Sequence, residues 1–239
     1  MVVVFPTETA YAIGGDALDP LVHQRIARIK CRPGNKPFPW IVASFAMAEK
    51  YGVFSPAAKK LAKKYWPGPL TLILPLKSPL PNLAVGQLSN TIAIRVPSHP
   101  VARTLSRVIG RPIIATSANL SGKSMCYTIA AVKKQFGDNV LIVNGKDFSS
   151  VKIKRLIYYS TLDAESIDSL LRGNDKDGNG NDKEKVDNPI ENIKNTPDLY
   201  INGGTLPRRK ASTIVRVEKD GAITLLREGA IKIEAESAK

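Results

Sequence analysis

The sequence predicts an α/β fold, in which strands and helices alternate along one chain of 239 residues. Short runs of β-branched residues, bounded by Pro and Gly, recur along the chain, and amphipathic stretches of about ten residues separate them. Hydrophobic residues make up 43% of the chain and charged residues 23%, as is usual for a globular protein. The length fits a single domain over residues 1–239.

The chain begins with a strand, a loop and a helix. Residues 2–5 form a β-branched and aromatic strand that ends at Pro6, and the polar residues 6–15 form a loop. A helix follows over 20–30, with Asp19 as its N-cap, so Lys30 lies at a helix end. The further elements expected before Gly145 are a strand at 40–44, helices at 45–51 and 56–66, strands at 70–75 and 91–96, a helix at 101–108, a strand at 113–116, a helix at 128–136 and a strand at 140–143.

Residues 146–198 differ in character from the rest. The stretch 172–195 is crowded with Asn, Asp, Lys and Gly, so it cannot bury enough apolar surface to offset its ordering entropy. We therefore expect a flexible insertion at about 146–198, with a short strand near 156–159 and a helical piece near 164–171 before its most polar part. The C-terminal strands are expected within 200–231, and two of them, 214–217 and 223–226, are joined by a turn at Asp220 and Gly221.

Composition excludes several classes of protein. No apolar run is long enough to span a membrane, and the N-terminus lacks the features of a secretory signal, so we expect a cytoplasmic protein that does not associate with membranes. Cys31 and Cys126 have neither CxxC spacing nor nearby His residues, which leaves no zinc site and no disulfide framework. Both cysteines are expected to be free thiols.

The net charge of +14 is concentrated in the first part of the chain. Residues 1–145 hold 18 Lys and Arg against five Asp and Glu, whereas the remainder is nearly balanced. Such a field attracts polyanions, which include nucleoside triphosphates and nucleic acids. A run such as Lys59, Lys60, Lys63 and Lys64 is equally typical of a solvated helix face.

Three polar clusters lie at the ends of predicted elements, and two of them follow strands, where α/β sheets usually bind ligands. Residues 6–17 offer hydroxyls and two glycines, residues 30–33 offer two cations, and residues 113–122 run from a buried strand into small hydroxyl and amide side chains. The proline that ends the second cluster favours an extended chain before it, which would let Lys30 and Arg32 face one anion. Each cluster taken alone also fits an ordinary turn or loop.

Two familiar catalytic designs are absent from the sequence. No GxxxxGK[ST] loop occurs, so any ATP site must use another arrangement. No GxSxG elbow surrounds Ser117, and His23 and His99 lie in a predicted helix and between two prolines, so a serine nucleophile would lack its partners. We therefore expect no side chain to act as a covalent catalyst.

In their order along the chain, these clusters resemble the YrdC-domain family of L-threonylcarbamoyladenylate synthases, in its short, single-domain form. The motifs that carry the resemblance are PTETAYAIGGDA at 6–17, KCRPGNK at 30–36, YWPGPLT at 65–71, IRVP at 94–97, TSANLSG at 116–122, and STIV at 212–215 with LREGAI at 226–231. The agreement covers residues 2–145 and returns from about Tyr200. Ala12 and Cys31 depart from the family pattern, which commonly has glycine at these positions.

The resemblance implies a YrdC-like twisted mixed sheet with flanking helices and a basic concave cavity. By the same resemblance, the residues expected to bind ATP and its phosphates are Lys30, Arg32, Ser117, Asn119, Ser212 and Arg227. The residues expected to bind threonine are Thr9, Arg95 and Thr116, with Arg95 pairing the carboxylate. No protein-ligated metal is implied, and Mg²⁺ would accompany the ATP.

The implied reaction converts L-threonine, bicarbonate and ATP to threonylcarbamoyl-AMP and pyrophosphate, for the N6-threonylcarbamoyladenosine modification of tRNA. The implied partner is the downstream tRNA threonylcarbamoyltransferase machinery. The excess positive charge of residues 1–145 also suits a direct contact with tRNA or double-stranded RNA. Two alternatives stay open. One is an RNA-binding module without catalysis, although aromatic residues make up only 6% of the chain and no RNA-binding motif interleaves them with the cations. The other is the carbamoyltransferase-type YrdC domain of hydrogenase maturation, which normally accompanies zinc-finger and acylphosphatase segments.

Overall fold

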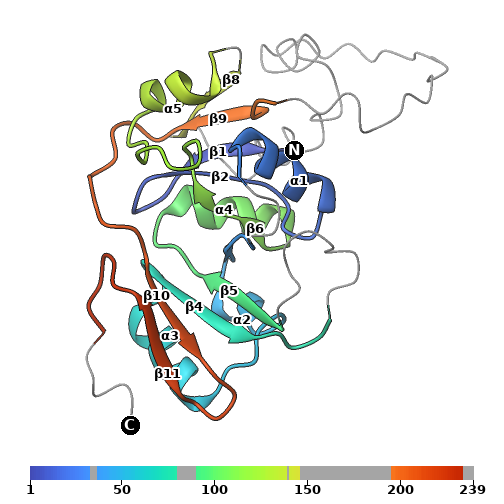
Figure 1. The fold of residues 1–239 in the computed structure, drawn as a ribbon, viewed down its shortest axis with the longest axis vertical. Helices are drawn as coiled ribbons and strands as arrows, with labels where there is room; N and C mark the ends of the chain where they lie inside the picture. The colour runs from blue at the N-terminus through green and yellow to red at the C-terminus, as the bar shows by residue number, and fades with distance from the viewer. Residues whose placement is uncertain (33–36, 80–89, 139, 146–194, 234–239) are drawn as a thin grey trace, which may run out of the picture.

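The computed structural model describes residues 1–32, 37–79, 90–138, 140–145 and 195–233. The described residues form two mixed β-sheets with helices packed on them, one sheet above the other along the long axis (Figure 1). The strand order is β7-β2-β1-β9-β8 in the five-stranded sheet and β11-β10-β4-β5-β3-β6 in the six-stranded sheet. The predicted α/β class with mixed strand directions is confirmed, and the strands are divided between these two sheets.

The five-stranded sheet begins with a tight hairpin. Its strands are β1 (Val3–Pro6), β2 (Tyr11–Gly14), β7 (Thr116–Ser117), β8 (Leu141–Asn144) and β9 (Leu199–Asn202). β1 pairs antiparallel with β2, with Pro6 opposite Tyr11. The sequence placed all of 6–15 in a loop, which is wrong for Tyr11–Gly14. These four residues are buried on both faces, so no polar alternation marked them as a strand.

The six-stranded sheet joins the middle of the chain to its C-terminal part. Its strands are β3 (Trp40–Ile41), β4 (Leu70–Pro75), β5 (Thr91–Arg95), β6 (Ile113–Ile114), β10 (Thr213–Val217) and β11 (Ile223–Arg227). β10 pairs parallel with β4 and antiparallel with β11. The predicted strands at 70–75, 91–96, 214–217 and 223–226 are confirmed within one residue, and Gly221 in the predicted turn has φ +94°.

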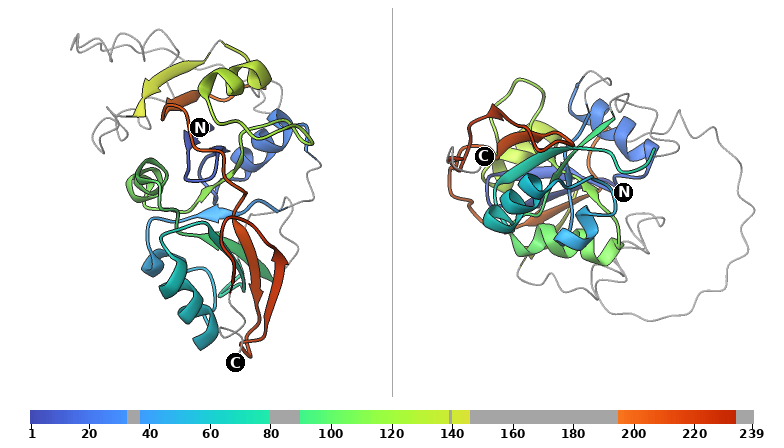
Figure 2. Two further views of the ribbon diagram at one scale, coloured as in Figure 1. Left: turned by 90° about the vertical axis from the view of Figure 1, so that its left-hand side faces the viewer. Right: turned by 90° about the horizontal axis from the view of Figure 1, so that it is seen from below.

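Five helices cover the sheets in the described ranges (Figure 2). They are α1 (Pro20–Ile29), α2 (Phe45–Ala48), α3 (Pro56–Tyr65), α4 (Pro100–Ile109) and α5 (Ile129–Phe136). The predicted N-cap of α1 is confirmed, since the Asp19 carboxylate accepts from the amide of Leu21 at 2.9 Å. Side chains of α1 and α5 share one core cluster with the five-stranded sheet and those of α4 share another, while α3 packs on β4 and β10. Helices on both faces explain why β1 and β2 are buried throughout.

The chain crosses from one sheet to the other at Ala115. The sequence predicted one strand over 113–116, but β6 pairs with β3 in the six-stranded sheet and β7 pairs with β2 in the five-stranded sheet. Gly14 of β2 lies directly against the crossing, because a Cβ built there would overlap the carbonyl oxygen of Ile114. The two sheets therefore approach each other closely at this point.

Several sequence predictions fall on residues 146–194, outside the described residues: the strand near 156–159, the helical piece near 164–171 and most of the insertion. The end of that segment is described. The Asp198 carboxylate pairs with Arg25 at 2.5 Å and accepts from the amide of Val2 at 2.7 Å. Cys31 and Cys126 are free thiols, as predicted. None of the described helices has the length and apolar character that crossing a membrane requires.

Candidate functional site

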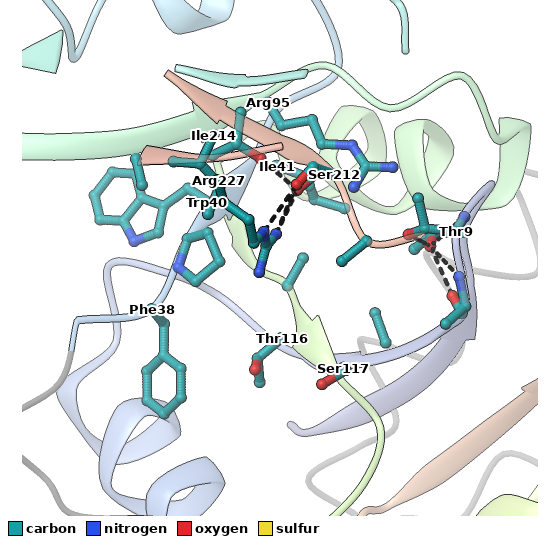
Figure 3. Close-up of a pocket in the computed structure, with 18 of the residues that line it drawn as sticks. Thr9, Phe38, Trp40, Ile41, Arg95, Thr116, Ser117, Ser212, Ile214 and Arg227 are labelled. Carbon is teal, nitrogen blue, oxygen red and sulfur yellow. Dashed lines mark hydrogen bonds between the residues drawn. The ribbon is translucent and has the colours of Figure 1, made fainter. Parts of the chain in front are cut away.

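A cavity of about 470 Å³ lies between the two sheets, and Figure 3 shows many of its lining side chains. Its walls come from the 7–12 turn and strand, residues 37–41, strands β4, β5 and β7, and the C-terminal strands β10 and β11. The predicted site residues that line it are Thr9, Arg32, Arg95, Thr116, Ser117, Ser212 and Arg227. The fold thus brings together residues that the sequence separates by more than 200 positions. Lys30 and Asn119 are the two predicted residues outside this lining.

The cavity is strongly basic. Its charged lining residues are Arg32, Arg95 and Arg227, and the described lining contains no Asp or Glu. Burial lowers the pKa of Arg32 and of Arg227, and repulsion from Arg95 lowers the pKa of Arg227 further. Cations that destabilise one another in this way favour a bound anion. The predicted basic concave cavity is confirmed.

Lys30 and Asn119 lie behind the wall that carries Ser117. Lys30 is the C-cap of α1 and is 3% exposed, and its ammonium donates to the backbone carbonyls of Ser117 and of Asn119, the latter at 2.5 Å. The Asn119 amide donates to the carbonyls of Leu120 at 2.8 Å and Lys123 at 2.7 Å. Burial, followed by repulsion from Arg32, lowers the pKa of Lys30 to about 8. In this structure both side chains stabilise the 117–123 loop.

Arg32 takes a different direction from Lys30. Its guanidinium donates to the carbonyl of Pro37 at 3.1 Å and lies 4.7 Å from the centre of the Phe38 ring. Its Nε is buried without a hydrogen-bond partner among the described residues. The predicted convergence of Lys30 and Arg32 on one anion is therefore not what the structure shows: Arg32 faces the cavity and Lys30 supports its wall.

Cys31 separates the two cations through a left-handed backbone. Its φ is +48°, and it is the one non-glycine residue with positive φ in the part of the chain that the structure describes. An L-residue in this conformation costs roughly 1–2 kcal/mol, a cost that glycine avoids. A glycine at this position would therefore be free of this strain.

We expect Cys31→Gly to raise the melting temperature by about 2 °C. Relief of the left-handed strain exceeds the roughly 0.5–1 kcal/mol that glycine adds through the entropy of the unfolded chain. Thermal unfolding followed by circular dichroism measures the change, with Cys31→Val as the destabilised comparison because a β-branched residue tolerates positive φ least. A glycine variant less stable than the parent would contradict this explanation.

At the predicted amino-acid end of the cavity, Arg95 is held by Glu8. The two side chains are 10% and 7% exposed, with 2.5 Å between Arg95 Nη2 and Glu8 Oε1, and the amide of Ser98 donates to the same carboxylate oxygen at 3.0 Å. Burial alone would raise the pKa of Glu8, but the Arg95 guanidinium and the Ser98 amide hold it below its usual value. Thr7 and Thr9 share a hydrogen bond of 3.1 Å in the same turn. Sequence reasoning missed Glu8, although it lies inside the first motif, because its partner is on a distant strand.

At the other end of the cavity, Ser212 and Arg227 form one unit. The Arg227 guanidinium donates to the carbonyl of Ser212 at 2.8 Å and 3.0 Å and to its hydroxyl at 3.2 Å (Figure 3). The Ser212 hydroxyl also lies 2.9 Å from the hydroxyl of Thr71, a lining residue that sequence reasoning did not single out. The threonine ends the quoted YWPGPLT motif, and that position was the available signal.

Within the described residues, no group of three or more His, Cys, Asp or Glu side chains is placed to hold a metal ion. Mg²⁺ prefers oxygen ligands, commonly carboxylates together with substrate phosphates.

The chain is similar to several known proteins. The family model Sua5/YciO/YrdC, described as "Telomere recombination", matches residues 1–157. A threonylcarbamoyl-AMP synthase of Pyrococcus abyssi is 45% identical over 145 residues, which are 60% of this chain and 42% of that protein. One of Idiomarina loihiensis is 36% identical over 142 residues, 58% of this chain and 76% of that protein. The crystal structure of P. abyssi Sua5 with L-threonine superposes with a TM-score of 0.65 at 29% identity, covering 95% of this chain and 50% of that one.

Proposed function

Because the chain belongs to the Sua5/YciO/YrdC family, we propose that it forms L-threonylcarbamoyl-AMP and pyrophosphate from L-threonine, bicarbonate and ATP. The observation that carries the proposal is the cavity itself, which is lined by the guanidinium groups of Arg32, Arg95 and Arg227 and by no Asp or Glu among the described residues. Of the three, only Arg95 has an ion-pair partner in the described part of the chain, Glu8, which lies behind this lining. Such a site suits a polyphosphate at one end and an amino-acid carboxylate at the other. Relatives named threonylcarbamoyl-AMP synthase, and a related structure with L-threonine, support this choice of substrates.

In this proposal the protein acts by positioning and by charge neutralisation. The threonine amine and bicarbonate first form the carbamate, with loss of one water. An oxygen of this carbamate then attacks the α-phosphorus of ATP, and pyrophosphate leaves with the electrons of the broken P–O bond. Arg32 and the Ser212–Arg227 unit bind the phosphates, with the Ser117 hydroxyl as a further donor, and Arg95 pairs the threonine carboxylate beside Thr9 and Thr116. Donors fixed before the reaction stabilise developing charge at little reorganisation cost. Enclosure between the two sheets protects the carbamate from water.

In this proposal Lys30 and Asn119 do not contact the phosphates. They stabilise the 117–123 loop, so that the Ser117 hydroxyl is positioned toward the phosphates. A Mg²⁺ ion bound to ATP would neutralise further phosphate charge, and no described side chain needs to ligate it alone. The adenylate would then pass to the tRNA-modifying transferase. These substrates and the tRNA acceptor are cytoplasmic species, so we propose that the protein acts in the cytoplasm.

The proposed reaction is tested directly with the purified protein. We expect pyrophosphate release, and an adenylate detectable by mass spectrometry, only when ATP, L-threonine and bicarbonate are all present. Omitting each substrate in turn is the control, and alanine in place of threonine tests the amino-acid end of the cavity. Turnover of ATP at the same rate without threonine would remove this function in favour of another use of the phosphate site.

A further inference from the structure

A second hollow, of about 580 Å³, lies between α2, α3 and α4 and shares no lining residue with the first cavity. We call it the α3–α4 groove. Three cations line it, Lys59 and Lys63 from α3 and Arg103 from α4, together with the rings of Phe45 and Trp66. The proposed reaction uses none of these five side chains.

The charge in the α3–α4 groove is largely uncompensated. Among the described residues, no Asp or Glu lines it. The carboxylate of Glu49 lies 3.6 Å from Lys59 Nζ, in a pair whose side chains are 40% and 58% exposed. A pair this exposed contributes little and is easily exchanged for another anion. Arg103 Nε is buried without a hydrogen-bond partner among the described residues. A buried donor left in this state favours a ligand that brings an acceptor.

The two rings beside these cations are fixed in position. The Trp66 indole N–H donates to the carbonyl of Leu70 at 2.7 Å. Its ring lies 6.0 Å from that of Phe54 at 77° and 6.4 Å from that of Phe45 at 57°. Both Phe45 and Trp66 remain partly exposed. Lys63 and Trp66 are already close in the sequence, and the fold adds Phe45 and Arg103 from α2 and α4.

We propose that the α3–α4 groove binds an unpaired stretch of RNA. Cations that follow a phosphate backbone, combined with rings on which bases stack, are how proteins hold single strands. A duplex would satisfy the cations but keep its bases away from the rings, and an acidic peptide would leave the rings unused. The inference does not rest on adenylate synthesis, since the groove is lined by different residues and RNA binding is measured without ATP or threonine.

The four lysines of α3 provide a matched test. Lys59 and Lys63 line the groove, whereas Lys60 and Lys64 lie on the same helix outside its lining. The probe is a 12-nucleotide single-stranded RNA at about 50 mM salt, followed by tryptophan fluorescence. Trp66 is the reporter, because the other tryptophan, Trp40, is 0% exposed. We expect quenching by the RNA, at least tenfold weaker binding for Lys59→Gln/Lys63→Gln, and less than a twofold change for Lys60→Gln/Lys64→Gln.

Salt dependence and competition complete the test. Loss of two phosphate contacts should reduce the slope of log K against log[salt] by about 1.4 in the groove variant only. Equal weakening of RNA binding in both double variants would overturn the proposal in favour of binding by diffuse positive charge. Absence of fluorescence quenching in the parent protein would also overturn it, because the RNA would then not contact Trp66. Poly-glutamate that displaces the RNA at equal charge concentration would overturn the role of the rings. If a double variant unfolds, Arg103→Gln replaces it in the same fluorescence titration. Weaker RNA binding by this variant is then the expected result, and unchanged binding would overturn the proposal.

Discussion

Lys30→Met is expected to lower kcat/KM for adenylate formation at least 100-fold and also to lower the melting temperature by about 5 °C. The Lys30 ammonium donates to two backbone carbonyls of the wall that carries Ser117, and it is buried. Methionine has similar length but no donor, so it leaves both carbonyls unpaired at roughly 1–3 kcal/mol each. The variant therefore loses the geometry of the phosphate wall together with part of the stability of the protein.

Arg32→Ala is the matched comparison for Lys30→Met. Arg32 lines the cavity, and the one hydrogen bond of its side chain among the described residues, to the carbonyl of Pro37, is exposed. We therefore expect at least tenfold lower activity with a melting temperature within about 2 °C of the parent. Steady-state rates and thermal unfolding of both variants separate the two roles. A parental melting temperature for Lys30→Met would show that the 117–123 loop does not depend on it, and parental activity for Arg32→Ala would remove Arg32 from the phosphate site.

Gly14→Ala is expected to destabilise the protein by about 4 kcal/mol or more, enough to prevent accumulation of soluble protein at 37 °C. A Cβ at this position would overlap the backbone carbonyl of Ile114 and press on the Phe5 ring at 3.2 Å. The Ile114 backbone cannot retreat, because it pairs with Trp40 in β3 while its own amide donates to the carbonyl of Gly15 at 2.8 Å. Relief would require the two sheets to separate at their crossing.

Urea unfolding measures this change where the variant can be purified, and the soluble fraction measures it otherwise. Gly110→Ala is the control, since Gly110 has φ +71° with nothing within 4 Å of an added Cβ. Its cost is the backbone strain alone, roughly 1–2 kcal/mol. Equal losses for the two variants would show that the contact between the sheets yields easily.

Elements with strong local signals were predicted well from the sequence. The helix after Asp19 and the strand at 70–75 combine caps or Pro boundaries with clear apolar patterns, and both are found where expected. β2 escaped prediction because helices cover both faces of its sheet, which removes the alternation that marks a strand. The division of 113–116 between two sheets also has no local signal, since it depends on which distant strands are available at each end.

For the site, the sequence and the family resemblance identified most of the polar lining but not its connections. Seven of the nine predicted residues line the cavity, because the motifs that carry them lie on the turns and strand ends that form its walls. The burial of Lys30 behind Ser117 depends on a contact between residues 87 positions apart, and a pattern along the chain does not contain it. The same holds for Glu8, whose partner Arg95 lies on β5.

The parallel pairing of β8 with β9 affects where the boundary of the folded unit is placed along the sequence. Parallel neighbours need a long return connection, and here residues 145–198 provide it. Such a connection can change in length during evolution without shifting the register of either strand, and the family match ends within it, at residue 157. A boundary drawn there by sequence similarity would cut away β9, β10 and β11, and with them Ser212 and Arg227. The recognisable part of the sequence is thus shorter than the unit that encloses the cavity.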